Sequence, residues 1–305
     1  MDLGLLIEAK KLVLKILKQH DIKPDGNTTE DVLRSYFNLK HKVIKSKPRS
    51  VTISKGLLAK AKSLNVETVL VTIESKFISG EDVNPFLSKS IFRSESHDHL
   101  LNDWQIHHLH LNTRKKKPTD YFNARSELLL FVHLTDDIVY FIDIRRHNEN
   151  YVFAQRDLLR IVRDNWPDVN KKFMVSDEEM NVYPKLDEEG ITKLRKKGYM
   201  FYTQADGYSY APNLGSAVSG FSMLAGLQMN EFHRELYKIH SYINEHEAEL
   251  IELLSKNSGI NLSSLNFTLA FKDWIFYVYE VNSGQFVNFN LTGYNPYAKN
   301  EKSAD

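Results

Sequence analysis

Three segments in the middle of the chain have apolar patterns typical of β-strands. Residues 104–111 alternate between apolar and polar positions, whereas residues 127–134 and 138–144 are short, mostly apolar runs. Successive side chains of a strand point to opposite faces, so alternation indicates one apolar face and a continuous apolar run indicates a buried strand. Only Thr135, Asp136 and Asp137 separate the last two segments, and so short a connection favours an antiparallel hairpin. We therefore expect a central antiparallel sheet.

Apolar residues at helical spacing predict a mostly helical region before this sheet. Thr28 and Asp31 are placed as a capping pair at the start of a helix. The elements expected in order are a helix over residues 3–20, a second helix after the capping pair, a helix over 55–64 and a strand over 66–73. Lysine and arginine are frequent here, so residues 1–75 form a basic N-terminal region.

The C-terminal part predicts a further α+β region with a long helix. The Asp206-Gly207 pair favours a tight hairpin turn, and residues 228–256 have the spacing of one charged helix. Three short strands follow over 265–271, 274–281 and 285–291, and residues 295–305 are expected to form a frayed tail. We expect an α+β protein with three regions, at 1–75, 76–170 and 171–305.

Composition narrows the classes of chemistry. The chain of 305 residues has no cysteine, which excludes disulfides, cysteine-ligated metals and a thiol nucleophile. Asp2 and Glu8 lie where a signal peptide needs positive charge, and no run approaches the roughly 18 to 20 apolar residues that cross a membrane. No nucleotide-binding glycine motif is present. We expect a cytoplasmic protein with no membrane partner and no cofactor.

Histidines gather on the first of the three central strands. His107, His108 and His110 fall within four residues, and alternation puts His108 and His110 on one face with Ile106. His107 shares the other face with Leu109 and Leu111. Because each face also carries apolar residues, the strand does not reveal which face meets solvent.

The hairpin that follows carries a recognisable order of residues. Arg125 opens an apolar strand, Asp136-Asp137 forms an acidic turn, and Val139-Tyr140 lies in the next strand. That strand ends in Arg146-His147, with Tyr151 shortly after. Over about residues 100–151 this order resembles the C-terminal hairpin of the RelE/ParE/HigB-like toxin superfamily.

The resemblance implies a small twisted antiparallel sheet whose concave face holds messenger RNA. RelE- and HigB-like members cut RNA without a metal ion, often on the ribosome, and a protein partner restrains the toxin. ParE-like members poison a DNA gyrase instead, so the resemblance leaves the target open.

The residues themselves suit metal-free RNA cleavage. The reaction needs a base for the 2′-hydroxyl proton, an acid for the leaving 5′-oxygen and a cation beside the phosphorane. Histidine suits the first two roles and arginine the third. The candidate catalytic residues are His107, His108, His110, Arg125, Arg146 and His147. Equally, the histidines can be structural, and the two arginines can form surface ion pairs with neighbouring aspartates.

Basic clusters provide a second line of inference. Residues 40–62 hold eight lysines or arginines and no acid, and a basic run follows the histidine strand. Such clusters attract phosphate whatever the base sequence. The candidate nucleic-acid contacts are Lys45, Lys47, Arg49, Arg114, Lys115, Lys116 and Lys117.

The expected function is a metal-independent endoribonuclease of toxin or phage-defence type, with RNA as its partner. A non-enzymatic module that binds nucleic acid or protein is the first alternative. A metal-dependent nuclease is the second, since His133, Asp143 or His147 could complete a site begun by the histidine strand.

Overall fold

The computed structural model describes residues 4–93, 98–175, 185–217, 221–272 and 274–287. The fold is α+β, as expected, and the chain divides into two compact units. Residues 41–224 form one unit, while residues 1–40 and 225–305 together form the other. The regions expected at 1–75 and 171–305 each cut across these units, whereas 76–170 lies within the central one.

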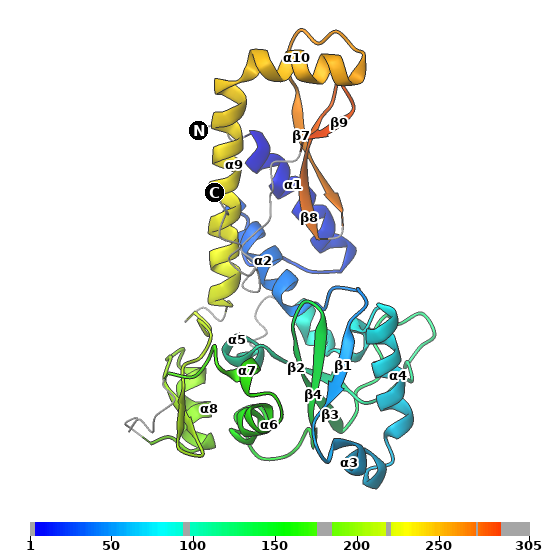
Figure 1. The fold of residues 1–305 in the computed structure, drawn as a ribbon, viewed down its shortest axis with the longest axis vertical. Helices are drawn as coiled ribbons and strands as arrows, with labels where there is room; N and C mark the ends of the chain where they lie inside the picture. The colour runs from blue at the N-terminus through cyan, green and yellow to red at the C-terminus, as the bar shows by residue number, and fades with distance from the viewer. Residues whose placement is uncertain (1–3, 94–97, 176–184, 218–220, 273, 288–305) are drawn as a thin grey trace. The chain divides into compact units, whose positions relative to one another are not determined.

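The central unit is built on a four-stranded sheet (Figure 1). The strands are β1 (Ser50–Ile53), β2 (Ile106–His110), β3 (Leu128–Leu134) and β4 (Ile138–Arg146). Their order is β1-β4-β3-β2, and the antiparallel hairpin of β3 and β4 confirms the prediction. The three predicted strands are antiparallel as expected, and the sheet is mixed because β1, which the sequence did not predict, pairs with β4 in parallel. A four-residue strand with a partner about 90 residues away leaves little local signal.

Both faces of this sheet are covered by apolar packing. The helices α3 (Leu57–Ser63) and α4 (Glu67–Ser79) pack on the face that carries Leu109, and Figure 1 shows them on the same side of the sheet. The other face carries Ile106 and meets α5 (His99–Trp104) and α6 (Asp157–Asn165). Alternation along β2 is therefore as expected, and apolar residues pack on both of its faces.

The strand predicted over residues 66–73 is wrong, because this segment lies in α4. Its β-branched residues alternate well enough to imitate a strand. The buried side chains are Leu70, Ile73 and Phe77, which follow helical spacing and pack on the sheet. Tertiary packing of this stripe outweighs local β-propensity.

The rest of the central unit consists of short elements. They are two 3-10 helices, η1 (Asn84–Phe86) and η2 (Lys89–Phe92), the helices α7 (Pro167–Asn170) and α8 (Glu188–Lys196), and the strands β5 (Thr203–Ala205) and β6 (Tyr208–Tyr210). The hairpin of β5 and β6 confirms the predicted turn: Asp206 has φ 48° and Gly207 φ 82°, the pair of positive values that such a turn needs.

The second unit joins the two ends of the chain. It contains α1 (Gly4–Gln19), α2 (Thr29–Lys42), α9 (Met223–Glu245), α10 (Glu247–Ser258) and a sheet of β7 (Phe267–Lys272), β8 (Ile275–Glu280) and β9 (Gln285–Val287). The last two residues of α2 and the first two of α9 belong to the central unit. The Thr28–Asp31 capping pair is confirmed, since each residue's backbone N–H donates to the other's side chain. The single helix expected over 228–256 is wrong: a break at His246 separates α9 from α10. The expected tail lies outside the described residues.

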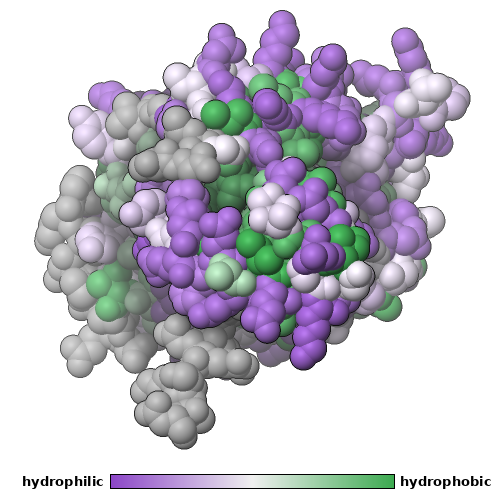
Figure 2. Space-filling view, turned by 90° about the horizontal axis from the view of Figure 1, so that it is seen from above, coloured by the Kyte–Doolittle hydropathy of each residue, from purple (hydrophilic) through white to green (hydrophobic). Residues whose placement is uncertain are grey.

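The molecular surface in the view of Figure 2 is largely hydrophilic, with apolar residues in small patches between polar ones. Within the described ranges, no helix is both long enough and apolar enough to span a bilayer.

Candidate functional site

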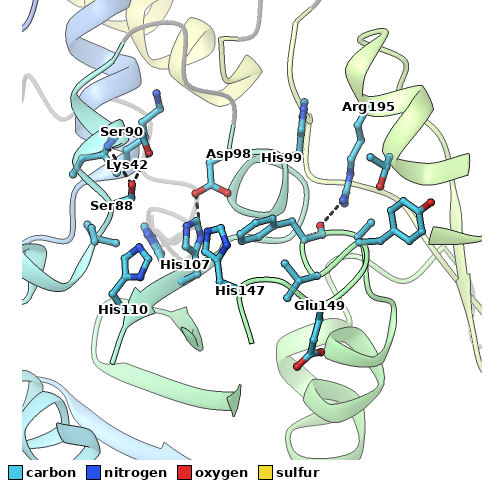
Figure 3. Close-up of a pocket in the computed structure, with 18 of the residues that line it drawn as sticks. Lys42, Ser88, Ser90, Asp98, His99, His107, His110, His147, Glu149 and Arg195 are labelled. Atoms are coloured by element: carbon cyan, nitrogen blue, oxygen red, sulfur yellow. Dashed lines mark hydrogen bonds and ion pairs between the residues drawn. The ribbon is translucent and has the colours of Figure 1, made fainter. Parts of the chain in front are cut away.

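A cavity of about 610 Å³ lies in the central unit and gathers most of the predicted catalytic residues (Figure 3). Its lining includes His107, His108, His110, Arg125 and His147. These five come from β2, from the loop that precedes β3 and from the residue after β4. The volume lies within the range of pockets that bury most of a small organic ligand.

Sheet geometry explains this convergence. His110 lies opposite Leu129, which in turn pairs with Arg145, so the end of β2, the start of β3 and the end of β4 meet at one end of the sheet. The backbone N–H of His147 donates to Glu127 at 2.6 Å, which fixes the chain just beyond β4. Because β2 is an edge strand, side chains from both of its faces can border a cavity beside that edge.

His108 has a carboxylate neighbour. Asp98 caps α5 by accepting the backbone N–H of Leu101 at 3.0 Å through Oδ1, and its other oxygen lies 3.6 Å from Nδ1 of His108. That separation suits an ion pair when the imidazole is protonated, and it is longer than a hydrogen bond. The ring of Phe153 packs against His108 with 5.0 Å between centroids. The carboxylate and the aromatic ring together fix one histidine in the cavity wall.

His110 and His147 form a stacked pair, with 6.1 Å between ring centroids and 14° between ring planes. Nδ1 of His110 lies 3.2 Å from both the backbone N and O of Ser126, so its neutral ring can use either tautomer there. Burial lowers the pKa of His110 to about 4. Its ring is therefore neutral at neutral pH and presents a flat face to His147.

His107 is also buried. Burial lowers its pKa to about 3, although the carboxylate of Asp98 acts in the opposite direction. Burial likewise lowers the pKa of His41, at the end of α2, to about 4. Both imidazoles are uncharged in the folded protein near neutrality.

Cations reach the cavity from three elements. Arg125 is exposed, and across the described part of the chain its guanidinium makes no hydrogen bond or ion pair. Lys42 is buried, and its ammonium donates to the carbonyl of Arg93 at 3.2 Å. Burial lowers the pKa of Lys42 to about 8, opposed by Asp98. Lys196 and Arg195 enter from α8.

Arg195 forms a buried ion pair that reaches the cavity wall. Its Nε lies 2.7 Å from Asp103, and its Nη1 donates to the carbonyl of Phe153 at 2.6 Å. Phe153 contacts both His108 and His147 through its ring. Burial raises the pKa of Asp103, while Arg195 lowers it. The pair ties α8 and α5 to the loop that holds Phe153.

Arg146 is the one predicted catalytic residue that does not line this cavity. It lies at the exposed end of β4, with Nη1 3.8 Å from Glu127. This matches the surface ion pair that the sequence left open, although the partner is a glutamate.

The predicted nucleic-acid contacts lie in two separate places. Arg114, Lys115, Lys116 and Lys117 are exposed in the loop after β2, at the end of the sheet where His110 lies. Lys45, Lys47 and Arg49 precede β1, whose first residue pairs with Ile138 at the other end. Along β4 the two ends are roughly 20 Å apart.

The three basic residues before β1 differ in their exposure and in their partners. Lys45 is exposed, whereas Lys47 lies 3.3 Å from Asp137. Arg49 is buried and donates to the backbone carbonyls of Lys45 at 2.8 Å and Thr135 at 3.3 Å. Its guanidinium ties the loop before β1 to the β3–β4 turn.

The residues considered as metal ligands have other partners. Asp143 pairs with Lys60 at 2.7 Å and with Arg145 at 2.8 Å. His133 is buried, with Nδ1 3.0 Å from the carbonyl of Gln105. Within the residues that the structure describes, no three histidine, cysteine, aspartate or glutamate side chains are grouped to hold a metal ion.

Sequence reasoning missed several residues of the cavity wall. They are Lys42, Ser88, Ser90, Asp98 and Arg195. Lys42 and Arg195 are about 150 positions apart in the sequence, so no short spacing motif could link these residues. Of these residues, only Asp98 could have been suspected from the sequence, because it is an acidic residue shortly before the histidine strand.

Comparison of the chain with protein-family models, with curated proteins and with solved structures finds no match.

Proposed function

We propose that the protein is a metal-independent endoribonuclease of toxin or phage-defence type, with the histidine cavity as its active site. The observation that carries the proposal is the His108–Asp98 pair in one cavity with the His110–His147 stack and Arg125. Two histidines beside a free guanidinium supply the groups that transphosphorylation of RNA needs.

In the proposed reaction, Nε2 of His108 accepts the proton of a 2′-hydroxyl. The 2′-oxygen attacks the adjacent phosphorus, and the bond from phosphorus to the 5′-oxygen breaks. His147 gives its proton to that leaving oxygen, so the products are a 2′,3′-cyclic phosphate and a 5′-hydroxyl. Asp98 stabilises the imidazolium that forms on His108, in the manner of a carboxylate beside a catalytic histidine. Arg125 neutralises charge on the phosphorane.

The lowered pKa values decide which histidines carry protons. Burial lowers the pKa of His110 to about 4 and that of His107 to about 3, so both rings are neutral at pH 7. Neither can act as the general acid at neutral pH. His110 instead orients His147 through their stacked rings, and His107 fills the wall behind Asp98.

The test is incubation of the purified protein with labelled RNA, with and without EDTA. His108→Gln and His147→Gln should each lower the cleavage rate by about 100-fold or more, since general acid–base groups typically contribute 10²- to 10⁴-fold. Cleavage should survive EDTA. Cleavage that disappears with EDTA and returns with zinc or manganese would favour a metal-dependent nuclease.

Arg125 and Arg146 provide a matched pair of variants. Both are exposed arginines at the same end of the sheet, but only Arg125 lines the cavity. Arg125→Ala should slow cleavage strongly, whereas Arg146→Ala should change it little. Equal effects would contradict an active site in this cavity.

The alternative is a module that binds nucleic acid without cutting it. The exposed run from Arg114 to Lys117, at the cavity's end of the sheet, favours this alternative. In that case the histidine variants bind RNA normally, and charge reversal at the basic run lowers affinity. Ribosome-bound RNA belongs in both assays, because the toxin resemblance implies ribosome-dependent cutting and a restraining protein partner.

A further inference from the structure

One end of the cavity carries groups that the proposed cleavage reaction does not use. Lys42, Ser88 and Ser90 line it, and Figure 3 shows them grouped beside the histidines. Lys42 comes from the end of α2, and the two serines flank the start of η2.

Hydrogen bonds hold these three residues together. Ser88 Oγ accepts two hydrogen bonds from Ser90. One comes from the hydroxyl, with 2.8 Å between the oxygens, and the other from the backbone N–H, with 3.3 Å between nitrogen and oxygen. Lys42 Nζ donates to the carbonyl of Arg93, whose own N–H donates to Ser90 O. A lysine from one helix is therefore fixed against the turn that carries the serines.

The hydroxyl proton of Ser88 is not used in either of these hydrogen bonds. A serine hydroxyl has one proton to donate, and both hydrogen bonds above use Ser88 Oγ as acceptor. Nothing in the described part of the chain accepts that proton. A donor hydroxyl beside an ammonium in a cavity wall is the chemistry that binds phosphate oxygens.

The charge balance at this end also favours an anion. Asp98 is the carboxylate that acts on Lys42, and the same group lies beside His108 and raises the pKa of His41 and His107. Burial lowers the pKa of Lys42 to about 8, and Asp98 opposes that shift. A phosphate bound beside Lys42 would add a second negative charge next to its ammonium.

We propose that Lys42, Ser88 and Ser90 form a binding subsite for a second phosphate group, one nucleotide along from the phosphodiester that is cut. The inference rests on the proposed function, because it is the histidine cluster that places the first phosphate. The substrate is then a strand segment with phosphates on both sides of the nucleotide in the cavity. A terminal phosphate on a dinucleotide should serve as the second group.

The first experiment measures binding without cleavage. Titration calorimetry at fixed salt compares the dinucleotide TpT with its 5′-phosphorylated and 3′-phosphorylated forms. All three are deoxynucleotides without a 2′-hydroxyl, so they can bind but cannot be cleaved. One of the phosphorylated forms should bind the wild-type protein roughly 10- to 100-fold more tightly than TpT, the range for hydrogen bonds to a charged group. In Lys42→Met and Ser88→Ala this ratio should fall to near one.

The control is Lys89→Met. Lys89 lies between the two serines on η2, but it is exposed and does not line the cavity. This variant should keep the full ratio. Equal ratios in Lys42→Met and Lys89→Met, or no gain from either terminal phosphate in the wild type, would overturn the subsite.

The second experiment separates the subsite from the proposed function. Cleavage of UpU and of its phosphorylated forms is followed in the same variants. If the wild-type binding ratio depends on Lys42 but neither UpU nor ribosome-bound RNA is cut, the subsite stands and the proposed ribonuclease activity is contradicted. If the cleavage rate is the same with and without a terminal phosphate in the wild type and in every variant, the proposed ribonuclease is supported and the subsite is contradicted.

Discussion

Buried histidines make the central unit sensitive to acid. Burial disfavours the imidazolium, so the pKa of His41 is lowered to about 4 and those of His107 and His133 to about 3. Each lies below the unfolded value of about 6.5. The folded protein therefore binds fewer protons than the unfolded chain below pH 6.5, and its stability falls as the pH falls through that window.

Replacing His133 tests this sensitivity away from the cavity. His133→Asn keeps a donor for the carbonyl of Gln105 but removes the titrating ring. Between pH 6.5 and 5 the wild type should lose roughly 1.5 kcal/mol for each such histidine, and the variant should lose correspondingly less. Urea denaturation at each pH measures the difference. An unchanged pH dependence in the variant would show that His133 does not contribute.

The buried pair of Asp103 and Arg195 should show strong coupling. Removing one partner leaves an uncompensated buried charge, at a cost of about 3–5 kcal/mol in the free energy of unfolding. We expect Asp103→Leu and Arg195→Met each to be strongly destabilising, and the double variant to be more stable than the sum of the two effects predicts. Urea denaturation of all four proteins tests this, and simple additivity would contradict it.

Among the elements, those stabilised by local signals were predicted well. The β3–β4 hairpin follows from two apolar strand segments joined by three residues, and the Asp206-Gly207 turn from backbone preference. Elements defined by distant partners were not predicted. β1 exists through its parallel partner β4, and α4 is a helix because Leu70, Ile73 and Phe77 meet the sheet.

The candidate site divides in the same way. His107, His108, His110, Arg125 and His147 were predicted because each lies in or next to a predicted strand. Asp98 and Arg195 were not, because a cap on α5 and an ion pair across about 90 residues exist only after folding.

The glycine at the end of α4 lies so close to another segment of backbone that a larger residue there should be costly. Gly80 ends the helix with φ 78°, and a Cβ there would lie 2.5 Å from the backbone nitrogen of Pro48. Gly56, which precedes α3, has φ 84° but open space around it. Gly56→Ala should cost about 1–2 kcal/mol for the left-handed backbone alone, and Gly80→Ala clearly more. Thermal denaturation measures both, and equal costs would contradict the close approach to Pro48.

For the whole molecule, the main feature is one compact unit inserted between the two segments of the other. Every residue of the two apolar clusters that cover the central sheet falls within 41–224. We expect a fragment of residues 41–224 to fold alone and to keep the histidine cavity. Amide hydrogen exchange should show protection in β3 and β4 equal to that in the full chain. Loss of that protection would mean that the central unit depends on its flanks.

The insertion also sets an order of events during synthesis. Glu8 of α1 accepts hydrogen bonds from Thr268 and Leu269 of β7, so the first helix packs against a strand made roughly 250 residues later. At about 5–20 residues per second this interval lasts roughly 10–50 s. The central unit can fold within it, whereas the apolar side of α1 stays without its strand. Over that time the nascent chain offers a binding surface for chaperones that the finished protein no longer has.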